Sequence, residues 1–529
     1  MTTAPPTTES PDRRGQSASP PPVGGGDGSS SGSGDQRETP LPWSQLGVLL
    51  AVGLAEPINC TLILPFLYKL VASFDVVASP RDVSLYASIL FTSFCVSQAL
   101  TSMLWGMLSD RFGRRSTVLI ALTGDLATFI LFGFSKSFAW ALVARSMNGL
   151  FSGNTGVVRA IVAEIADDSN RPRMMALMSL TWNAGVLIGA AVGGLLADPV
   201  AQYPHIFGRF ELLRTFPYLL PCMVGSLTTA IGLVVGLLKL KETLVVGRRK
   251  DSRRPAAEES DPATETSPLV GGAAHQTPGP PAQSVLALLT PTSRRVLGAG
   301  LLMFLANAMS DQLYPIFAAT AASEGGLGFA PRSIGFSLMV AGIAVVYLQL
   351  VAYPRLARKH GVLWCYQMGA MVEAPYFFAL PCLSLLAAHI NRMLDARAPL
   401  PLSWEGPWAS RAGVEYCLLW ALLVALLLVR VVGNVFVYTS INLLVANIAP
   451  SKATLGAMSG MQQVAVMCAR ITGPLVSGAL WGWSIGSGLP YPLNSHLVWV
   501  IGGSLMVLSW RVSSRLPVSV NTFAAGRDR

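Results

Sequence analysis

Acidic side chains interrupt several long apolar stretches of this sequence. Glu56, Asp125, Asp311 and Glu373 each have mainly apolar neighbours along the chain. A charged group in hydrocarbon is costly, so a carboxyl in such a place by default marks a functional site facing a shared water-filled cavity. Burial also disfavours the charged form of a carboxyl. We therefore expect Glu56, Asp125 or Asp311 to exchange a proton near neutral pH.

Basic and amide side chains accompany these acids at helical spacing. Arg430, Asn434 and Tyr438 follow one another at four-residue intervals, which places them on one helix face. Because arginine stays charged, it can hold an anionic group, and the mixture of acids and bases suggests a charged or zwitterionic organic solute. The alternative for any single residue is a buried structural ion pair. The predicted substrate and proton site comprises Glu56, Asn59, Asp125, Arg145, Asp311, Arg430, Asn434 and Arg470.

A glycine- and arginine-rich motif, GMLSDRFGRR at 106–115, joins two of the apolar stretches. We expect Gly106 to let helices approach closely, Gly113 to permit a tight turn and Asp110 to face the positive N-terminal end of a neighbouring helix. The arginines are expected to pair with Glu164. The alternative is an ordinary basic loop. The predicted conformational latch consists of Gly106, Asp110, Arg111, Gly113, Arg114 and Glu164.

The motif has a degenerate copy, YPRLARKHG at 353–361, which keeps the basic residues and a glycine but lacks the acid. A copy at the same place in each half of the chain indicates an internal repeat. Between the copies, the stretch 139–163 is predicted to be one helix. Its polar face comprises Arg145, Asn148, Ser152 and Arg159. A stripe of glycines, which favours close helix packing, comprises Gly149, Gly153 and Gly156.

The elements that must position these residues are membrane helices. Of 529 residues, 52% are hydrophobic and only 12% are charged, about half the charge of a soluble domain. Only helices satisfy the backbone of many separate spans, so the predicted fold is all-α and polytopic, with twelve transmembrane helices in two pseudo-symmetric six-helix halves. The predicted spans, each of about 20 apolar residues, are 44–68, 84–108, 116–134, 139–163, 174–197, 217–239, 295–319, 333–354, 362–388, 413–446, 455–482 and 494–511.

Polar segments divide the chain around these spans. The tail 1–40 is rich in Pro, Gly and Ser, and 241–293 is the longest polar break, so both are predicted to be flexible and cytoplasmic. Basic residues concentrate in alternate links, which predicts that both termini face the cytoplasm and that the net charge of +10 does not indicate nucleic-acid binding. The predicted parts are a tail 1–40, a six-helix half 41–240, a linker 241–293, a second half 294–513 and a tail 514–529.

These segments together resemble a known family. The latch motif resembles the signature of the major facilitator superfamily, and WNAGVLIGAAVGG (182–194) is similar to the glycine-rich motif of its drug:proton antiporter branch, with Ala190 where proline is expected. The stretches LAEPINCTLILPFLY (54–68), GLFSGNTGVVRAIVAEI (149–165) and DQLYPIF (311–317) resemble fungal relatives of the plant zinc-induced facilitator-like family. The resemblance implies a secondary transporter that exchanges a small organic solute for protons by alternating access.

Other functions fit the sequence less well. Seven cysteines form no CxxC pair and five histidines do not cluster, so we expect no metal site, no cofactor and no enzyme activity. The alternative function is a non-transporting receptor or sensor on the same fold. The expected partners are a small solute, protons and the lipid bilayer, with the chain acting as a monomer. The motif ETSPLV (265–270) resembles an acidic dileucine sorting signal, which suggests a vacuolar or lysosomal location as an alternative to the plasma membrane.

Overall fold

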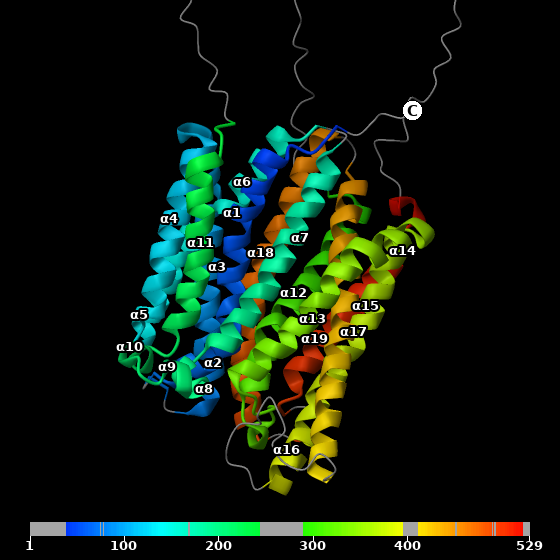
Figure 1. Ribbon diagram of the computed structural model, residues 1–529. Coiled ribbons are helices and arrows are strands. Elements are labelled where there is room, and N and C mark those ends of the chain that lie inside the picture. The colour runs from blue at the N-terminus through cyan, green and yellow to red at the C-terminus, as the bar shows by residue number, and fades with distance from the viewer. Residues whose placement is uncertain are drawn as a thin grey trace, which may run out of the picture. The chain divides into compact units, whose positions relative to one another are not determined.

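The computed structural model describes residues 39–521 with gaps at 75, 78, 168–169, 244–288, 395–410, 450–451, 489 and 491–493. The predicted N-terminal tail, most of the predicted linker and the motif at 265–270 therefore lie outside the described residues. Throughout the described ranges the regular elements are helical. The fold is all-α, as predicted (Figure 1).

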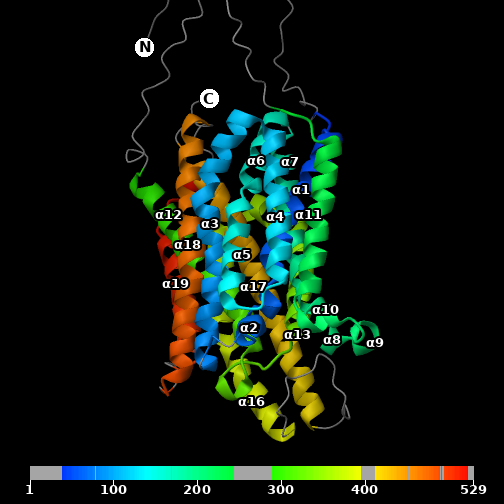
Figure 2. The same ribbon diagram turned by 90° about the vertical axis from the view of Figure 1, so that its left-hand side faces the viewer.

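In the first half, the described residues form eight long or medium helices and three short ones. The short helices follow α7 and lie at one end of the bundle in both views (Figures 1 and 2). The helices are α1 (Trp43–Leu62), α2 (Leu64–Ala72), α3 (Pro80–Phe112), α4 (Arg114–Gly133), α5 (Phe138–Phe151), α6 (Asn154–Ile165), α7 (Arg171–Leu196), α8 (Pro199–Gln202), α9 (Pro204–Phe207), α10 (Glu211–Thr215) and α11 (Leu219–Lys239).

The part of the second half that the structure describes contains eight further α-helices and four short 3-10 or π segments. The π segment η3 joins α13 to α14. The α-helices are α12 (Pro291–Ala319), α13 (Pro331–Tyr347), α14 (Tyr353–His360), α15 (Val362–Ala379), α16 (Leu383–Leu394), α17 (Arg411–Asn447), α18 (Lys452–Gly486) and α19 (Leu497–Ser514). The short segments are η2 (Ala322–Glu324), η3 (Leu348–Ala352), η4 (Leu380–Cys382) and η5 (Val518–Asn521).

Local sequence signals set several helix starts. Ser79 and Ser137 accept hydrogen bonds from backbone N–H groups at the starts of α3 and α5, and Thr290 does the same for α12. Such caps satisfy donors that a helix start leaves open. Proline opens α3 and α12, where its missing N–H has no cost. Residues next to the starts of α3, α5 and α12 therefore determine where these helices begin.

Eleven helices within the described ranges are long and apolar enough to cross a membrane. Expected span 139–163 is not among them, because the chain breaks after Ser152 into α5 and α6. The expected single polar face is thus divided between two helices: Arg145 and Asn148 lie on α5, whereas Arg159 lies on α6. Side chains of another helix replace the backbone bonds lost at the break, as described below.

Helix packing repeats between the two halves. In the first half α1 packs on α7 and α11, α11 packs on α4, and α5 packs on α3 and α4. In the second half α12 packs on α18 and α19, α19 packs on α15, and α17 packs on α13 and α15. Each contact of one half thus has a counterpart in the other, which is the pattern that a duplicated six-helix unit produces.

Two equivalent helix pairs, α3 with α18 and α7 with α13, join the halves. Ser84 of α3 donates a hydrogen bond to the Gly478 carbonyl of α18 at 3.0 Å. A Cβ on Gly194 of α7 would lie 2.5 Å from the Cα of Gly335 on α13, so the two backbones touch. Glycine permits this approach because it has no side chain. Ser84 and Gly335 lie near the starts of α3 and α13, and Gly194 lies near the end of α7, just before α8.

Candidate functional site

Asp125 on α4 is the centre of a buried polar cluster in the first half. Its carboxylate accepts hydrogen bonds from Asn59 of α1 at 2.7 Å and from Asn148 of α5 at 2.7 Å. Thr229 of α11 donates to it at 3.3 Å. Asp125 is only 4% exposed. Four helices thus converge on one carboxylate, and both its oxygens are satisfied.

Arg145 lies next to this cluster and is fully buried. It donates to the Asn148 side-chain oxygen at 2.9 Å, so Asn148 links the guanidinium to Asp125. The guanidinium also lies over the Phe94 ring, 4.2 Å from its centroid, a cation–π arrangement. Its Nε and Nη2 atoms have no hydrogen-bond partner. Because the side chain is enclosed, Arg145 contributes charge to the interior but does not line an open surface in this conformation.

Glu56 lies at the break between α5 and α6. Gln98 of α3 donates to Glu56 Oε1 at 2.6 Å and to the Ser152 carbonyl at 2.9 Å, so one amide serves both the acid and the broken helix. Thr155, at the start of α6, donates to the other carboxylate oxygen of Glu56. A helix N-terminus attracts negative charge, and broken membrane helices commonly place such ends at transport sites.

Arg470 of α18 is the residue of the second half that interacts with Glu56. It interacts electrostatically with Glu56, and its Nη2 lies 3.7 Å from the Cys60 sulfur of α1. The side chains of Cys60, Phe94 and Cys95 form a small apolar cluster against the same region. Glu56 and Arg470 therefore attract each other electrostatically across the two halves, whereas the hydrogen-bond partner of the Arg470 side chain is Cys60.

Asp311 and Arg430 form an ion pair inside the second half, between α12 and α17. The Asp311 side chain is 60% exposed and the Arg430 side chain 13% exposed. Asn434, one turn along α17 from Arg430, donates to Asn307 of α12 at 2.7 Å. The guanidinium of Arg430 also lies 5.6 Å from the centroid of the Tyr376 ring. The ion pair thus has one enclosed partner and one accessible partner.

The expected site residues therefore fall into three groups rather than one. Asn59, Asp125 and Arg145 are enclosed in the first half; Glu56 faces Arg470 across the halves; Asp311, Arg430 and Asn434 lie in the second half. Residues that the predicted set left out hold these groups in place by hydrogen bonds; they are Gln98, Asn148, Thr155, Thr229 and Asn307. Glu373, also outside that set, interacts electrostatically with Asp311 and Arg430.

The expected latch residues Asp110, Gly113, Arg114 and Glu164 come together around the link between α3 and α4. Arg114 bridges Asp110 at 2.6 Å and Glu164 at 2.9 Å. Gly113 has a φ of 99°, which favours glycine and turns the chain between α3 and α4. Asp110, in the last turn of α3, pairs with the side chain of Arg114, the first residue of α4, so its partner lies at the start of the next helix. The expected close approach at Gly106 is absent, because a Cβ there would meet nothing within 4 Å.

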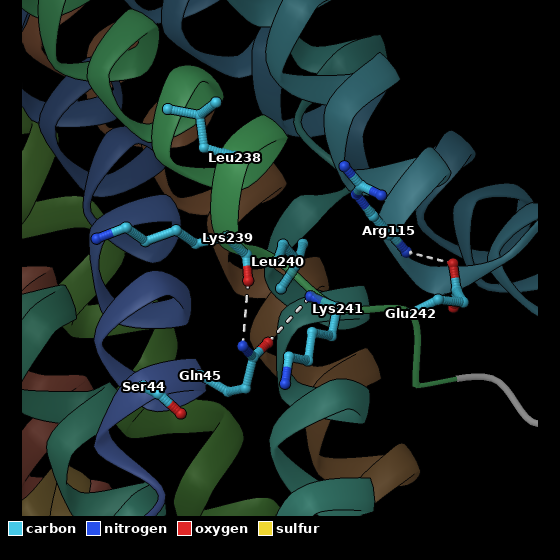
Figure 3. A pocket seen from close by; sticks show the side chains of 8 residues that line it. All are labelled: Ser44, Gln45, Arg115, Leu238, Lys239, Leu240, Lys241 and Glu242. Atoms are coloured by element: carbon cyan, nitrogen blue, oxygen red, sulfur yellow. Dashed lines mark hydrogen bonds between the residues drawn. The ribbon is translucent and has the colours of Figure 1, made fainter.

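A residue that follows the last helix of this half in the sequence completes the latch. Glu242, just past α11, accepts hydrogen bonds from the backbone N–H groups of Arg114 at 2.8 Å and Arg115 at 3.1 Å, so it caps α4. Thr243 donates to Glu164 at 2.6 Å. Figure 3 shows Glu242 and Arg115 at the edge of a pocket of about 540 Å³ between α1, α4 and α11. Because its lining residues lie at helix ends, this pocket is separate from the three buried groups.

Comparison with known proteins agrees with this geometry. The sequence matches the Major Facilitator Superfamily over residues 49–394. A major facilitator superfamily multidrug transporter of Aspergillus fumigatus is 28% identical over 508 residues, covering 84% of this chain and 80% of the relative. The Protein ZINC INDUCED FACILITATOR 1 of Arabidopsis thaliana is 28% identical, covering 88% and 90%. The crystal structure of a D-xylose–proton symporter superposes with a TM-score of 0.62 at 14% identity, covering 90% and 98%.

Two six-helix halves with charged groups between and within them define a polytopic membrane transporter, not an enzyme. The chain belongs to the major facilitator superfamily. The resemblances to this superfamily, to multidrug carriers and to zinc-induced facilitators are thereby confirmed.

Proposed function

We propose that this protein is a secondary active transporter that exchanges a small organic solute for protons by alternating access. The observation that carries the proposal is the Asp311–Arg430 ion pair, whose acid is accessible although its neighbours Ser310 and Gln312 on α12 are buried. An accessible carboxylate facing hydrocarbon would be costly, so this face of α12 is proposed to line an aqueous chamber between the halves.

The electrostatic attraction between Glu56 and Arg470 supports the same mechanism. It acts between α1 of one half and α18 of the other, and rocking of the halves would strengthen and weaken it. The solute is proposed to bind among Glu56, Asp311, Arg430 and Arg470, whereas Asp125 and Arg145 brace the first half. The latch around Arg114 is proposed to reorganise as the halves move.

The distribution of basic residues supports cytoplasmic termini. We infer a vacuolar or lysosomal membrane, with the plasma membrane as the alternative, from the sorting-signal-like motif at 265–270, and we propose that the carrier is a monomer. The name of the Aspergillus relative contains the words multidrug transporter, which favours organic drugs as first substrates to test.

Reconstitution tests the transport proposal directly. Purified protein in proteoliposomes should move ethidium, a fluorescent organic cation, only when a pH gradient is imposed, and a protonophore should abolish the movement. Asp311→Asn should reduce the rate at least tenfold, because it removes the accessible anion. Ethidium or other drugs that bind but never cross, in liposomes whose orientation is verified, would instead favour a receptor.

A further inference from the structure

The third membrane span of each half, α4 in the first and α15 in the second, begins in the same way. Gly113 precedes α4 with φ 99° and ψ 149°, and Gly361 precedes α15 with φ 89° and ψ 162°. Asp125 is the twelfth residue after the first glycine, and Glu373 is the twelfth after the second. Since both stretches are helical from the glycine onward, the two acids occupy the same place in the repeated unit.

The surroundings of these two equivalent acids differ sharply. Asp125 receives hydrogen bonds from Asn59, Asn148 and Thr229. Glu373 is fully buried, and neither of its oxygens has a hydrogen-bond partner, although the Asn307 side chain lies beside it. The first environment stabilises a carboxylate, whereas the second lacks the donors that a carboxylate needs.

Close helix packing encloses Glu373. A Cβ on Gly433 of α17 would lie 2.4 Å from the Glu373 Cβ, and one on Gly369, a turn before Glu373, would lie 2.9 Å from the Gly433 carbonyl. The backbones of α15 and α17 therefore touch at this level. Water has no room on that side, so any charge on Glu373 must be balanced by protein groups.

The charged and titratable groups facing Glu373 come from all the packed helices. Arg430 of α17 and Asp311 of α12 interact with it electrostatically. Tyr376 and Tyr366 lie on its own helix, and the Tyr366 hydroxyl is held by Ser509 of α19 at 2.7 Å. The neighbourhood thus offers one cation to two carboxyls, and Asp311 already holds that cation.

We propose that Glu373 carries a proton in this conformation and is the group that releases it during transport. The neutral form is the one compatible with an enclosed carboxyl that has no donor and no free counter-ion. When a cationic group of the solute takes the accessible Asp311, Arg430 is freed and pairs with Glu373. The proton then leaves a Glu373 oxygen for chamber water, and no other bond changes. One proton is exchanged for one solute cation.

Infrared difference spectroscopy tests the protonation without any transported solute. Wild-type protein and the Glu373→Gln variant are compared in lipid nanodiscs in heavy water near neutral pH. Glu373→Gln should lose one C=O stretching band of a protonated carboxyl. The matched variant Asp125→Asn, at the equivalent position, should lose carboxylate bands instead. Loss of only carboxylate bands in Glu373→Gln would overturn the proposal.

A second comparison tests the exchange of partners. In an Asp311→Asn background Arg430 has no other acid, so Glu373 should be ionised. Adding Glu373→Gln to that background should then remove carboxylate bands and no protonated C=O band. A protonated band that persists at Glu373 without Asp311 would show that Arg430 does not switch, and the exchange would be rejected.

The transport role rests on the proposed function and is measured separately. Glu373→Gln should abolish ethidium accumulation driven by a pH gradient, and ethidium binding to this variant should no longer change with pH. Binding that keeps the pH dependence of the wild type would assign Glu373 a structural role and overturn the coupling. If wild-type protein moves no solute at all, the proposed function fails, whereas the infrared results still decide the proton on Glu373.

Discussion

At the scale of single residues, Asp125 is the carboxylate that interacts electrostatically with the buried Arg145, to which Asn148 links it. Asp125→Ala should therefore destabilise the protein by about 3 kcal/mol, because it leaves a guanidinium without compensation in the interior. Thermal unfolding of the purified protein, followed by the fluorescence of a thiol probe, measures the change. Thr229→Val removes one long hydrogen bond, at 3.3 Å, to the same carboxylate and should cost only about 1.5 kcal/mol. Equal effects of the two changes would argue against a charge-balancing role.

The sequence reveals such acids but not their partners. Asp125, Asp311 and Glu373 are conspicuous because charge is rare in apolar spans. Thr229 and Gln98 are not conspicuous, since neutral polar side chains are common in membrane helices and can bond to their own backbone. Whether an acid receives hydrogen bonds, as Asp125 does, or receives none, as Glu373 does, depends on helices that are distant in the sequence. The contrast between Asp125 and Glu373 therefore required the three-dimensional arrangement.

At the scale of elements, glycines set how closely helices pack. Gly335→Ala should force α13 away from α7, because a Cβ there would lie 2.7 Å from the Gly194 Cα. We expect a lower unfolding temperature and a larger distance between spin labels placed on the two helices. Gly298→Ala on α12 is the matched control, because its Cβ would meet nothing within 4 Å. That change should add up to about 1 kcal/mol through helix propensity; a similar loss in both variants would contradict the packing argument.

Helix existence was easier to predict than helix continuity. Eleven of the expected spans correspond to long apolar helices, because hydropathy over about 20 residues is a strong signal. The break after Ser152 was not foreseen, because glycines at 149, 153 and 156 also fit a continuous packing stripe. Gly153 instead accommodates the Trp105 ring, and Gln98 takes the Ser152 carbonyl. The break thus depends on side chains of α3, and the sequence of α5 and α6 alone contains no sign of these contacts.

At the scale of the whole molecule, the repeat explains why two helix pairs rather than one hold the halves together. The pair α3 with α18 and the pair α7 with α13 are exchanged by the same internal symmetry. The joints at Ser84–Gly478 and Gly194–Gly335 lie near the ends of their helices rather than at the middle of the bundle. Rocking about a central site requires that these joints open when the opposite end closes.

Locking one joint should therefore stop transport while leaving solute binding intact. Leu85 of α3 and Ala479 of α18 line one small pocket between these helices. In a variant without native cysteines, Leu85→Cys with Ala479→Cys should be bridged by a bifunctional methanethiosulfonate. Ethidium movement should then fall at least tenfold and return on reduction, whereas each single-cysteine variant treated alike should keep its rate. Transport that survives a verified bridge would mean that this joint stays closed throughout the cycle, and rocking of the two halves would have to be abandoned.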